Sequence, residues 1–448
     1  MNFTFISRIL LQENTTYRPL AFTDWSRQLV SRIEKRYGLS SLCFSNPIPT
    51  KCVVQNYTED PAVKLLQEYI QIDTSVKDNI EYAVNFWERQ AAAIGLPFFV
   101  YRPASKPICV ITWTGTNPEL PSIILNSHMD VVPVAEQDWT YPPFSAYIDE
   151  NGNMYGRGTQ DTKSISIHYL EAIRKLMKDN VRLKRTVHLT FIPDEETGSF
   201  NGMIPFIETE EFRSLNPGFF FDEGLSTNDT LVVTYQDKRP WQLNLTLHGE
   251  GGHGSSITDG TAMEKLHRLL DVTTQFREQQ KQIMISNSTD YGSYTTLNVN
   301  IIRGGSVPNI IPNRVNVVID IRLAVSARVD EVESLIQSWL TPLGSNTELT
   351  FIRKLDVSEP TRLDETNPYW VAVKDALQEM DISFTPSICP ATSDMVYVRN
   401  RGFPAIGFAY RPYTVSRIHA ADEYLNMDIF LKGIDVYVNI LKKVANLL

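Results

Sequence analysis

The sequence predicts an α/β fold with a second, α+β domain inserted into it, and three observations support that prediction. Short apolar runs alternate with amphipathic helical stripes along most of the chain, as expected for a sheet covered by helices on both faces. An acid or a histidine follows several of these runs. Near residue 239 the pattern changes to apolar residues alternating with polar ones, as in strands with one solvated face.

The first α/β part begins at Asp60-Pro61, which is a helix start signal. Helical stripes follow from residue 61, over 80–94 and from 163, and apolar runs predict strands at 98–101, 108–113, 122–125, 187–192 and 218–221. We therefore expect a catalytic domain whose first part spans residues 56–238. Residues 1–55 show no sustained period, and we treat them as an N-terminal extension with one helix near residues 24–37.

The segment 239–353 has the element order β-α-β-β-α-β, which is the ferredoxin-like order. Its expected helices are 262–280 and 329–340, and its expected strands are 241–247, 295–303, 314–323 and 349–351. The α/β pattern resumes over 354–448, the second part of the catalytic domain, with a helix at 368–380, a strand at 405–408 and a long helix from 427.

Composition excludes several classes of protein. A formal net charge of −10 argues against a nucleic-acid or anionic-membrane partner, and no apolar run approaches the ~20 residues that span a bilayer. The N-terminus lacks the basic region of a signal peptide. Cys43, Cys52, Cys109 and Cys389 are too few and scattered for a disulfide framework, so reduced, buried thiols are expected. We predict a cytoplasmic protein.

Five residues form a candidate metal site: His128, Asp161, Glu196, Glu223 and His419. Nearly all of them stand just after an apolar run or at a turn before a helix, and such residues gather at one edge of an α/β sheet. Two imidazoles and three carboxylates suit two borderline divalent ions such as Zn²⁺. A carboxylate that bridges both ions is typical of two-metal hydrolases.

Two further acids extend this site. Asp130 follows His128 by two positions and is placed to accept the free N–H of its ring. Glu195 stands next to Glu196. Because adjacent buried acids repel each other unless a cation neutralises them, one is expected to bind metal and the other to serve as the general base.

Several segments together resemble the M20 metallopeptidase family, and within it the aminoacylases. The resemblance covers residues 57–448, and its motifs lie at 127–134, 156–163, 194–198, 222–224, 252–255, 303–305, 309–312, 391–399 and 418–419. It implies a zinc-peptidase-like catalytic domain with an inserted lid and dimerisation domain. It also implies hydrolysis of N-acyl-L-amino acids to a carboxylate and a free L-amino acid.

The resemblance also implies residue roles. His128 and Glu223 bind one zinc ion, Glu196 and His419 bind the other, and Asp161 bridges them. Asp130 orients His128, and Glu195 is the general base. His253 reaches the active site of a neighbouring subunit, which implies a homodimer. Asn309, Arg322 and Arg399 contact the substrate, Arg399 near its free carboxylate. Ser256 departs from the aminoacylase pattern, which has a basic residue there, so acyl preference stays open.

Simpler explanations compete with these roles. His253 could be only a turn residue among glycines, and Arg322 and Arg399 could be surface or salt-bridge arginines. His168, His188, His248 and His267 lie within periodic segments and are expected to be structural. Two rival functions also remain. An M20 dipeptidase or carboxypeptidase would use the same metals, whereas a binding or scaffold protein would bind none.

Overall fold

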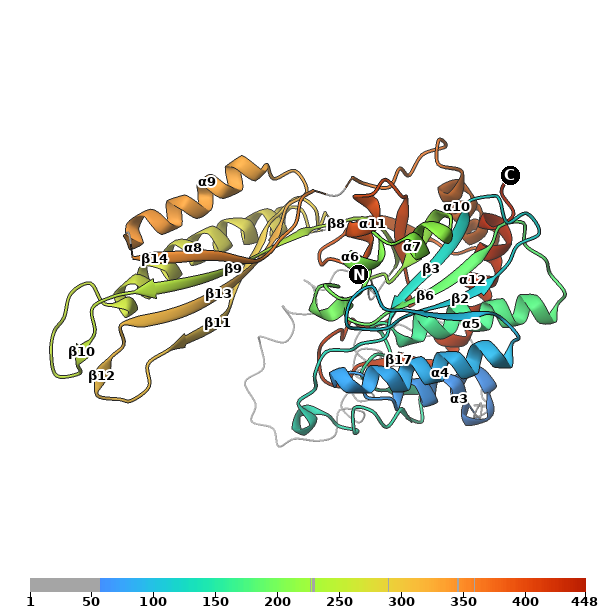
Figure 1. Cartoon of the computed structure of the whole chain (residues 1–448), viewed down its shortest axis with the longest axis horizontal. Helices are drawn as coiled ribbons and strands as arrows, with labels where there is room; N and C mark the ends of the chain where they lie inside the picture. The colour runs from blue at the N-terminus through green and yellow to red at the C-terminus, as the bar shows by residue number, and fades with distance from the viewer. Residues whose placement is uncertain (1–56, 226, 228–229, 289, 345, 358) are drawn as a thin grey trace, which may run out of the picture. The chain divides into compact units, whose positions relative to one another are not determined.

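The computed structural model describes residues 57–448 except 226, 228, 229, 289, 345 and 358. The predicted N-terminal extension, its helix near residues 24–37, Cys43 and Cys52 all lie outside the described residues. An eight-stranded mixed sheet forms the largest layer, which can be followed in Figure 1. Its strands in spatial order are β1 (Phe98–Tyr101), β2 (Ile108–Trp113), β6 (Val187–Ile192), β3 (Ser122–His128), β7 (Pro217–Asp222), β16 (Ala405–Phe408), β8 (Leu231–Asp237) and β15 (Phe384–Cys389).

Helices cover both faces of this sheet, as predicted. Successive residues of a strand point to opposite faces, and those of β2 divide accordingly. Cys109 and Ile111 join one core, which also contains residues of α3 (Pro61–Ile70), α4 (Ile80–Ala93), α5 (Lys163–Lys178), α10 (Pro368–Glu379) and α12 (Met427–Val444). Ile108 and Val110 join another core, with residues of α6 (Met203–Phe206), α7 (Glu210–Ser214) and α11 (Met395–Arg399).

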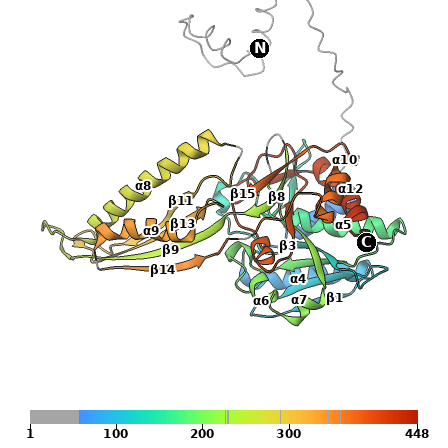
Figure 2. The ribbon, with the colours of Figure 1, turned by 90° about the horizontal axis from the view of Figure 1, so that it is seen from above.

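The sequence explains how the helix that carries part of the site is held. α5 is buried along most of its length and packs beside α12 (Figure 2). Lys163 at its first turn is fully buried, and its ammonium donates to the carbonyls of Tyr69 and Ile72. A buried cation that donates to carbonyl groups avoids the cost of unpaired burial, so the start of α5 is tied to the end of α3.

A second, four-stranded antiparallel sheet has its own hydrophobic core. Its strands in spatial order are β11 (Thr296–Gly304), β13 (Arg314–Leu323), β9 (Arg239–His248) and β14 (Thr347–Lys354). The helices α8 (Ala262–Ser286) and α9 (Val329–Leu340) cover one face (Figure 1). Residues of β13 alternate between buried and more exposed, as the sequence pattern indicates. The order β-α-β-β-α-β is therefore present.

Smaller elements complete the fold. A ribbon pairs β10 (Gly252–His253) with β12 (Ile310–Ile311), and a small sheet contains β17 (Tyr424–Asn426), β5 (Asn153–Tyr155) and β4 (Tyr147–Ile148). Short 3₁₀ helices are η1 (Tyr57–Glu59), η2 (Lys77–Asn79), η3 (Glu136–Asp138), η4 (Glu195–Thr197) and η5 (Thr341–Leu343). Cys109 and Cys389 are buried free thiols, as predicted. Among the described helices, none combines the length and apolar character needed to cross a membrane.

Candidate metal centre

The candidate ligands gather at one edge of the large sheet, where three parallel strands end. β3 pairs in parallel with β6 and with β7, so their carboxyl ends meet at the same edge. His128 is the last residue of β3, Glu196 lies in η4 just after β6, and Glu223 follows β7. The strand before His128 is longer than the sequence predicted, because it continues through the histidine itself.

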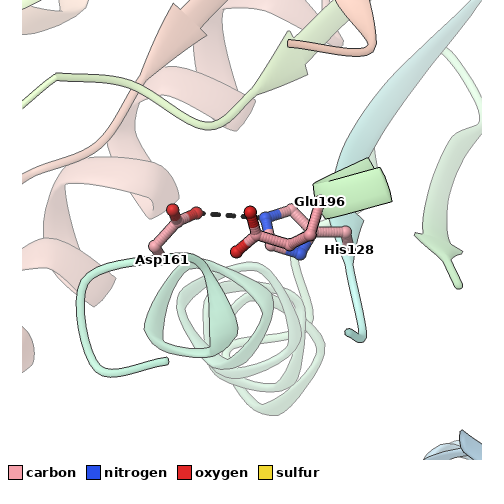
Figure 3. A group of neighbouring side chains, drawn as sticks. All are labelled: His128, Asp161 and Glu196. Atoms are coloured by element: carbon pink, nitrogen blue, oxygen red, sulfur yellow. Dashed lines mark hydrogen bonds and ion pairs between the residues drawn. The ribbon is translucent and has the colours of Figure 1, made fainter. Parts of the chain in front are cut away.

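Asp161 stands at the centre of the cluster, and its two carboxylate oxygens face different histidines. Oδ1 lies 3.0 Å from His128 Nε2, the contact that Figure 3 draws, and Oδ2 lies 3.2 Å from His419 Nε2. Glu196 lies 2.9 Å from His419 Nε2, and Glu223 lies 3.8 Å from His128 Nε2. The five predicted ligands therefore form two groups that share Asp161.

These distances suit metal binding. One ligand atom each from His128, Asp161 and Glu196 lies within 4.8 Å of the others, and the same holds for His128, Glu195 and Glu223. His419 takes a left-handed backbone with φ of 64°. Histidine tolerates that conformation better than most residues, and strained backbone of this kind clusters at functional sites. The donor set of imidazole and carboxylate matches the ligands that Zn²⁺ prefers.

Asp130 holds the site differently from the prediction. The Nδ1–H of His128 donates to the backbone carbonyl of Asp130 at 2.8 Å, whereas the nearest carboxylate oxygen of Asp130 is 3.6 Å away. A carbonyl can only accept, so a proton lies on Nδ1, and Nε2 is the ring nitrogen that faces the carboxyl groups of the cluster. The carboxylate instead accepts the amide N–H groups of Glu195, at 3.1 Å, and Glu196, at 3.2 Å. Asp130 thereby fixes both His128 and the Glu195–Glu196 turn.

The electrostatics of the cluster favour a divalent cation. Burial opposes ionisation of His128, but its hydrogen bonds to neighbouring carboxyl groups outweigh burial and raise its pKa well above the usual value. Burial, followed by the Asp161 carboxylate, raises the pKa of Glu223 to about 8. Burial and then Glu223 also raise the pKa of Glu195. Acids that crowd together in a buried site resist ionisation unless a cation compensates their charge, and metal binding would supply that charge.

Two of the predicted substrate-binding residues and His253 lie outside this cluster. His253 is exposed on the β10–β12 ribbon, and the hydrogen bonds of its ring join it to Ser255 in its own turn. Asn309 is exposed on the same ribbon, where its carbonyl accepts the Gly254 N–H at 2.8 Å. Arg322 at the end of β13 pairs with Asp320 and donates to Thr392 at 3.1 Å. The structure thus groups His253 with Asn309, apart from the ligands.

Arg399 does not have the position expected of a substrate-binding arginine. It is buried, and its Nη1 pairs with Asp237 at 2.8 Å. Its Nε and Nη2 both donate to the carbonyl of Ala405, at 3.1 and 2.9 Å. A guanidinium whose fork is occupied in this way has no face left for a substrate carboxylate. The salt-bridge explanation therefore fits Arg399, and we leave it out of the proposed site.

Other residues around the site escaped the sequence analysis. Asp222 ends β7 directly before Glu223, and its buried carboxyl accepts from Asn126 at 3.2 Å. Arg411 is fully buried and donates to the carbonyl of Gly224, directly after Glu223. Glu423 is fully buried against the turn that carries Asp161. In the sequence, only their closeness to the motif residues could have drawn attention to these three residues. Their contacts join distant segments, so no local periodicity predicts them.

Comparisons with known proteins agree with this geometry. Aminoacylase-1 of Sus scrofa is 38% identical over 392 residues, covering 87% of this chain and 96% of that protein. Aminoacylase-1 of Dictyostelium discoideum is 35% identical over 406 residues, covering 87% and 98%. The fold of human carnosine dipeptidase 1 matches with a TM-score of 0.71 at 15% identity, covering 87% and 97%.

The model of one family, described as peptidase family M20/M25/M40, matches residues 124–443. That span begins in β3 just before His128, and all five candidate ligands lie within it. The family model matches most of the chain, and the alignments with the two aminoacylases cover nearly all of each relative. We conclude that the chain belongs to peptidase family M20/M25/M40.

Proposed function

We propose that the protein is a zinc-dependent amidohydrolase that cleaves N-acyl-L-amino acids to a carboxylate and a free L-amino acid. One observation above all supports this activity: 38% identity to a curated aminoacylase-1 across 96% of that protein. The clustered ligands agree with it, because an amide hydrolase of this class needs a metal site that is open to substrate. His419 provides such an opening, since about half of its side chain is exposed.

Two zinc ions have a natural place in the cluster. His128, Glu223 and one oxygen of Asp161 would hold one ion, and His419, Glu196 and the other oxygen of Asp161 would hold the second. When bound, the ions would polarise the amide carbonyl and lower the pKa of the attacking water. The Nε2 atoms of both imidazoles face Asp161, each near a different carboxylate oxygen, and this arrangement supports the assignment.

Glu195 is the general base. Its amide is fixed by the Asp130 carboxylate, and a ligand atom of its side chain lies within 4.8 Å of those of His128 and Glu223. From that position it takes the proton of the attacking water and returns it to the leaving nitrogen. His253 of a second copy donates to the carbonyl oxygen as negative charge develops there. Its exposed position on the ribbon is compatible with reaching another subunit.

The remaining roles follow from the same assignment. Residues 56–238 and 354–448 form the catalytic domain, and residues 239–353 form the lid and dimerisation domain of a cytoplasmic homodimer. The separate hydrophobic core of the four-stranded sheet supports that division. Asn309 and Arg322 contact the substrate when the lid closes over it. Both belong to the inserted segment, and Arg322 already touches Thr392 of the catalytic domain.

A substrate panel tests the proposed activity. Protein reconstituted with zinc is assayed against N-acetyl and longer N-acyl amino acids and, in parallel, against unmodified dipeptides. We expect turnover of the N-acyl amino acids and loss of that turnover after a chelator, with recovery when zinc is restored. The fold shared with carnosine dipeptidase 1 makes dipeptide hydrolysis the rival. Turnover of dipeptides alone would replace the proposal, and an inactive protein that binds no zinc would favour a scaffold role.

A further inference from the structure

Glu423 is a buried carboxylate enclosed by the turn that carries Asp161. Its side chain is 0% exposed and pairs with Arg157 Nη1 at 2.7 Å. Its Oε1 also accepts the backbone N–H groups of Gln160, at 2.6 Å, of Gly158, at 3.1 Å, and of Asp161, at 3.2 Å. Burying an ion costs several kcal/mol unless it is fully paired. The buried carboxylate therefore needs the donors of the turn, and the turn is itself held in place by the carboxylate.

The same carboxylate belongs to the segment that delivers the second histidine. Glu423 follows His419 by four positions and directly precedes β17. The side chain of Gln160 strengthens the connection, since it donates to the carbonyls of Val415 and Tyr424 and accepts the Arg417 N–H at 3.0 Å. The Asp161 turn and the His419 segment are therefore interlocked around Glu423.

Glu423 itself is not placed to be a ligand. Both of its oxygens already accept hydrogen bonds from the turn, and its side chain has no exposed surface. Asp161, by contrast, points its oxygens at His128 and His419 (Figure 3 shows the first of these contacts). Glu423 thus acts behind the site, on the backbone from which Asp161 projects.

We propose that Glu423 is a positioning residue for metal binding, holding Asp161 and His419 at the spacing that the shared carboxylate requires. The inference rests on the metal site of the proposed function. Groups that orient ligands from behind typically change metal affinity by about 10–100-fold when they are altered. Because Asp161 faces both histidines, loss of Glu423 should weaken both zinc ions rather than one.

Zinc affinity measured by competition with a chromogenic chelator tests the role. The full chain is compared with Glu423→Gln, which keeps the shape and removes the charge, and with Glu423→Asp, which keeps the charge but shortens the reach. Asp237→Asn is the matched control, since Asp237 also forms a buried arginine pair, at 2.8 Å, without touching the Asp161 turn. Circular dichroism establishes that each variant is folded, and the absorption of cobalt-loaded protein reports ligand geometry.

We expect Glu423→Gln to bind both zinc ions about 10–100-fold more weakly, with Glu423→Asp in between and Asp237→Asn within about twofold of the unmodified chain. The cobalt absorption should change only in the Glu423 variants. Unchanged affinity in Glu423→Gln, or an equal loss in Asp237→Asn, overturns the inference. If Glu423→Gln does not fold, wild-type affinity in Glu423→Asp overturns it. Failure of the unmodified chain to bind zinc refutes the proposed function instead.

Discussion

His128 and His253 are assigned to one active site, yet the chain surrounds them in opposite ways. The His128 side chain is 1% exposed, its Nδ1–H is fixed by a carbonyl, and acids crowd its Nε2. His253 is exposed, and its ring bonds only within its own turn among the described residues. The buried region is preorganised within a single chain, while the ribbon presents its histidine outward. Under the proposed function, metal binding would therefore need one chain, whereas catalysis would need a second.

The largest expected effect on turnover comes from Glu195, which belongs to the buried cluster around His128. Glu195→Gln removes the base but keeps the amide that Asp130 holds, so zinc content should be unchanged. The turnover number for N-acetyl-methionine should fall about 10²–10⁴-fold, the usual contribution of a general base. Zinc analysis and steady-state kinetics on the same sample measure both quantities. A variant with full zinc and undiminished turnover would remove Glu195 from the mechanism.

The role of the exposed His253 is tested by mixing two variants of low activity. His253→Asn should lower turnover about 10²–10³-fold, as loss of one oxyanion donor does elsewhere, and leave zinc affinity intact. When this variant and Glu195→Gln are unfolded and refolded together, a mixed dimer contains one site with both groups present. Random pairing then restores about a quarter of normal activity. No recovery in a sample that contains mixed dimers would mean that His253 acts within its own chain or not at all.

Arg399 gives a smaller test of the same contrast between structural and catalytic placement. Arg399→Met leaves Asp237 without its partner at 2.8 Å, and breaking a buried pair in this way costs about 3–5 kcal/mol of stability. We expect a lower Tm with KM for the N-acyl amino acid unchanged, as measured well below the Tm. The Tm and KM of Arg322→Met serve as the comparison, because Arg322 is partly exposed and, unlike Arg399, is proposed to contact the substrate. A raised KM in Arg399→Met alone would restore Arg399 to substrate binding.

The sequence pointed to the candidate ligands more readily than to the residues that hold them in place. His128, Glu196 and Glu223 could be found because each ends or follows an apolar run, and parallel strands bring such positions to one edge. Glu423 could not be found in this way, since its partners lie 262 to 266 residues away and are mostly backbone N–H groups. β8 and β15 were missed as well. Their parallel pairing is set by tertiary contact rather than by local period.

Asp130 and Arg399 illustrate two further limits. Spacing placed Asp130 beside His128 correctly, but it could not distinguish a carbonyl from a carboxylate as the acceptor. The Arg399 motif suggested a ligand for substrate, whereas the fold brings Asp237, 162 residues earlier, against its guanidinium. In both cases the residue was identified and its role was decided by a contact that sequence spacing does not encode.

A third histidine, His168, separates the effect of burial on a histidine pKa from the effect of neighbouring acids. His168 is as buried as His128, but its ring donates to the Phe430 carbonyl and has no carboxylate partner among the described residues, so burial lowers its pKa to about 3. The folded chain therefore keeps His168 neutral, while the unfolded chain binds a proton below about pH 6.5. Its contribution to stability is present above that pH and is lost as the pH falls toward 3.

His168→Gln should weaken this dependence while keeping a donor toward Phe430. Between pH 7 and 5.5, the unmodified chain should lose about 1 kcal/mol more unfolding free energy than the variant, because only the histidine takes up a proton on unfolding. Urea unfolding at the two pH values measures the difference. His188, also buried and with its pKa lowered to about 4, contributes equally to both proteins and cancels. Parallel stability losses in the two proteins would show that His168 is not held neutral, and burial alone would then not explain how His128 differs from it.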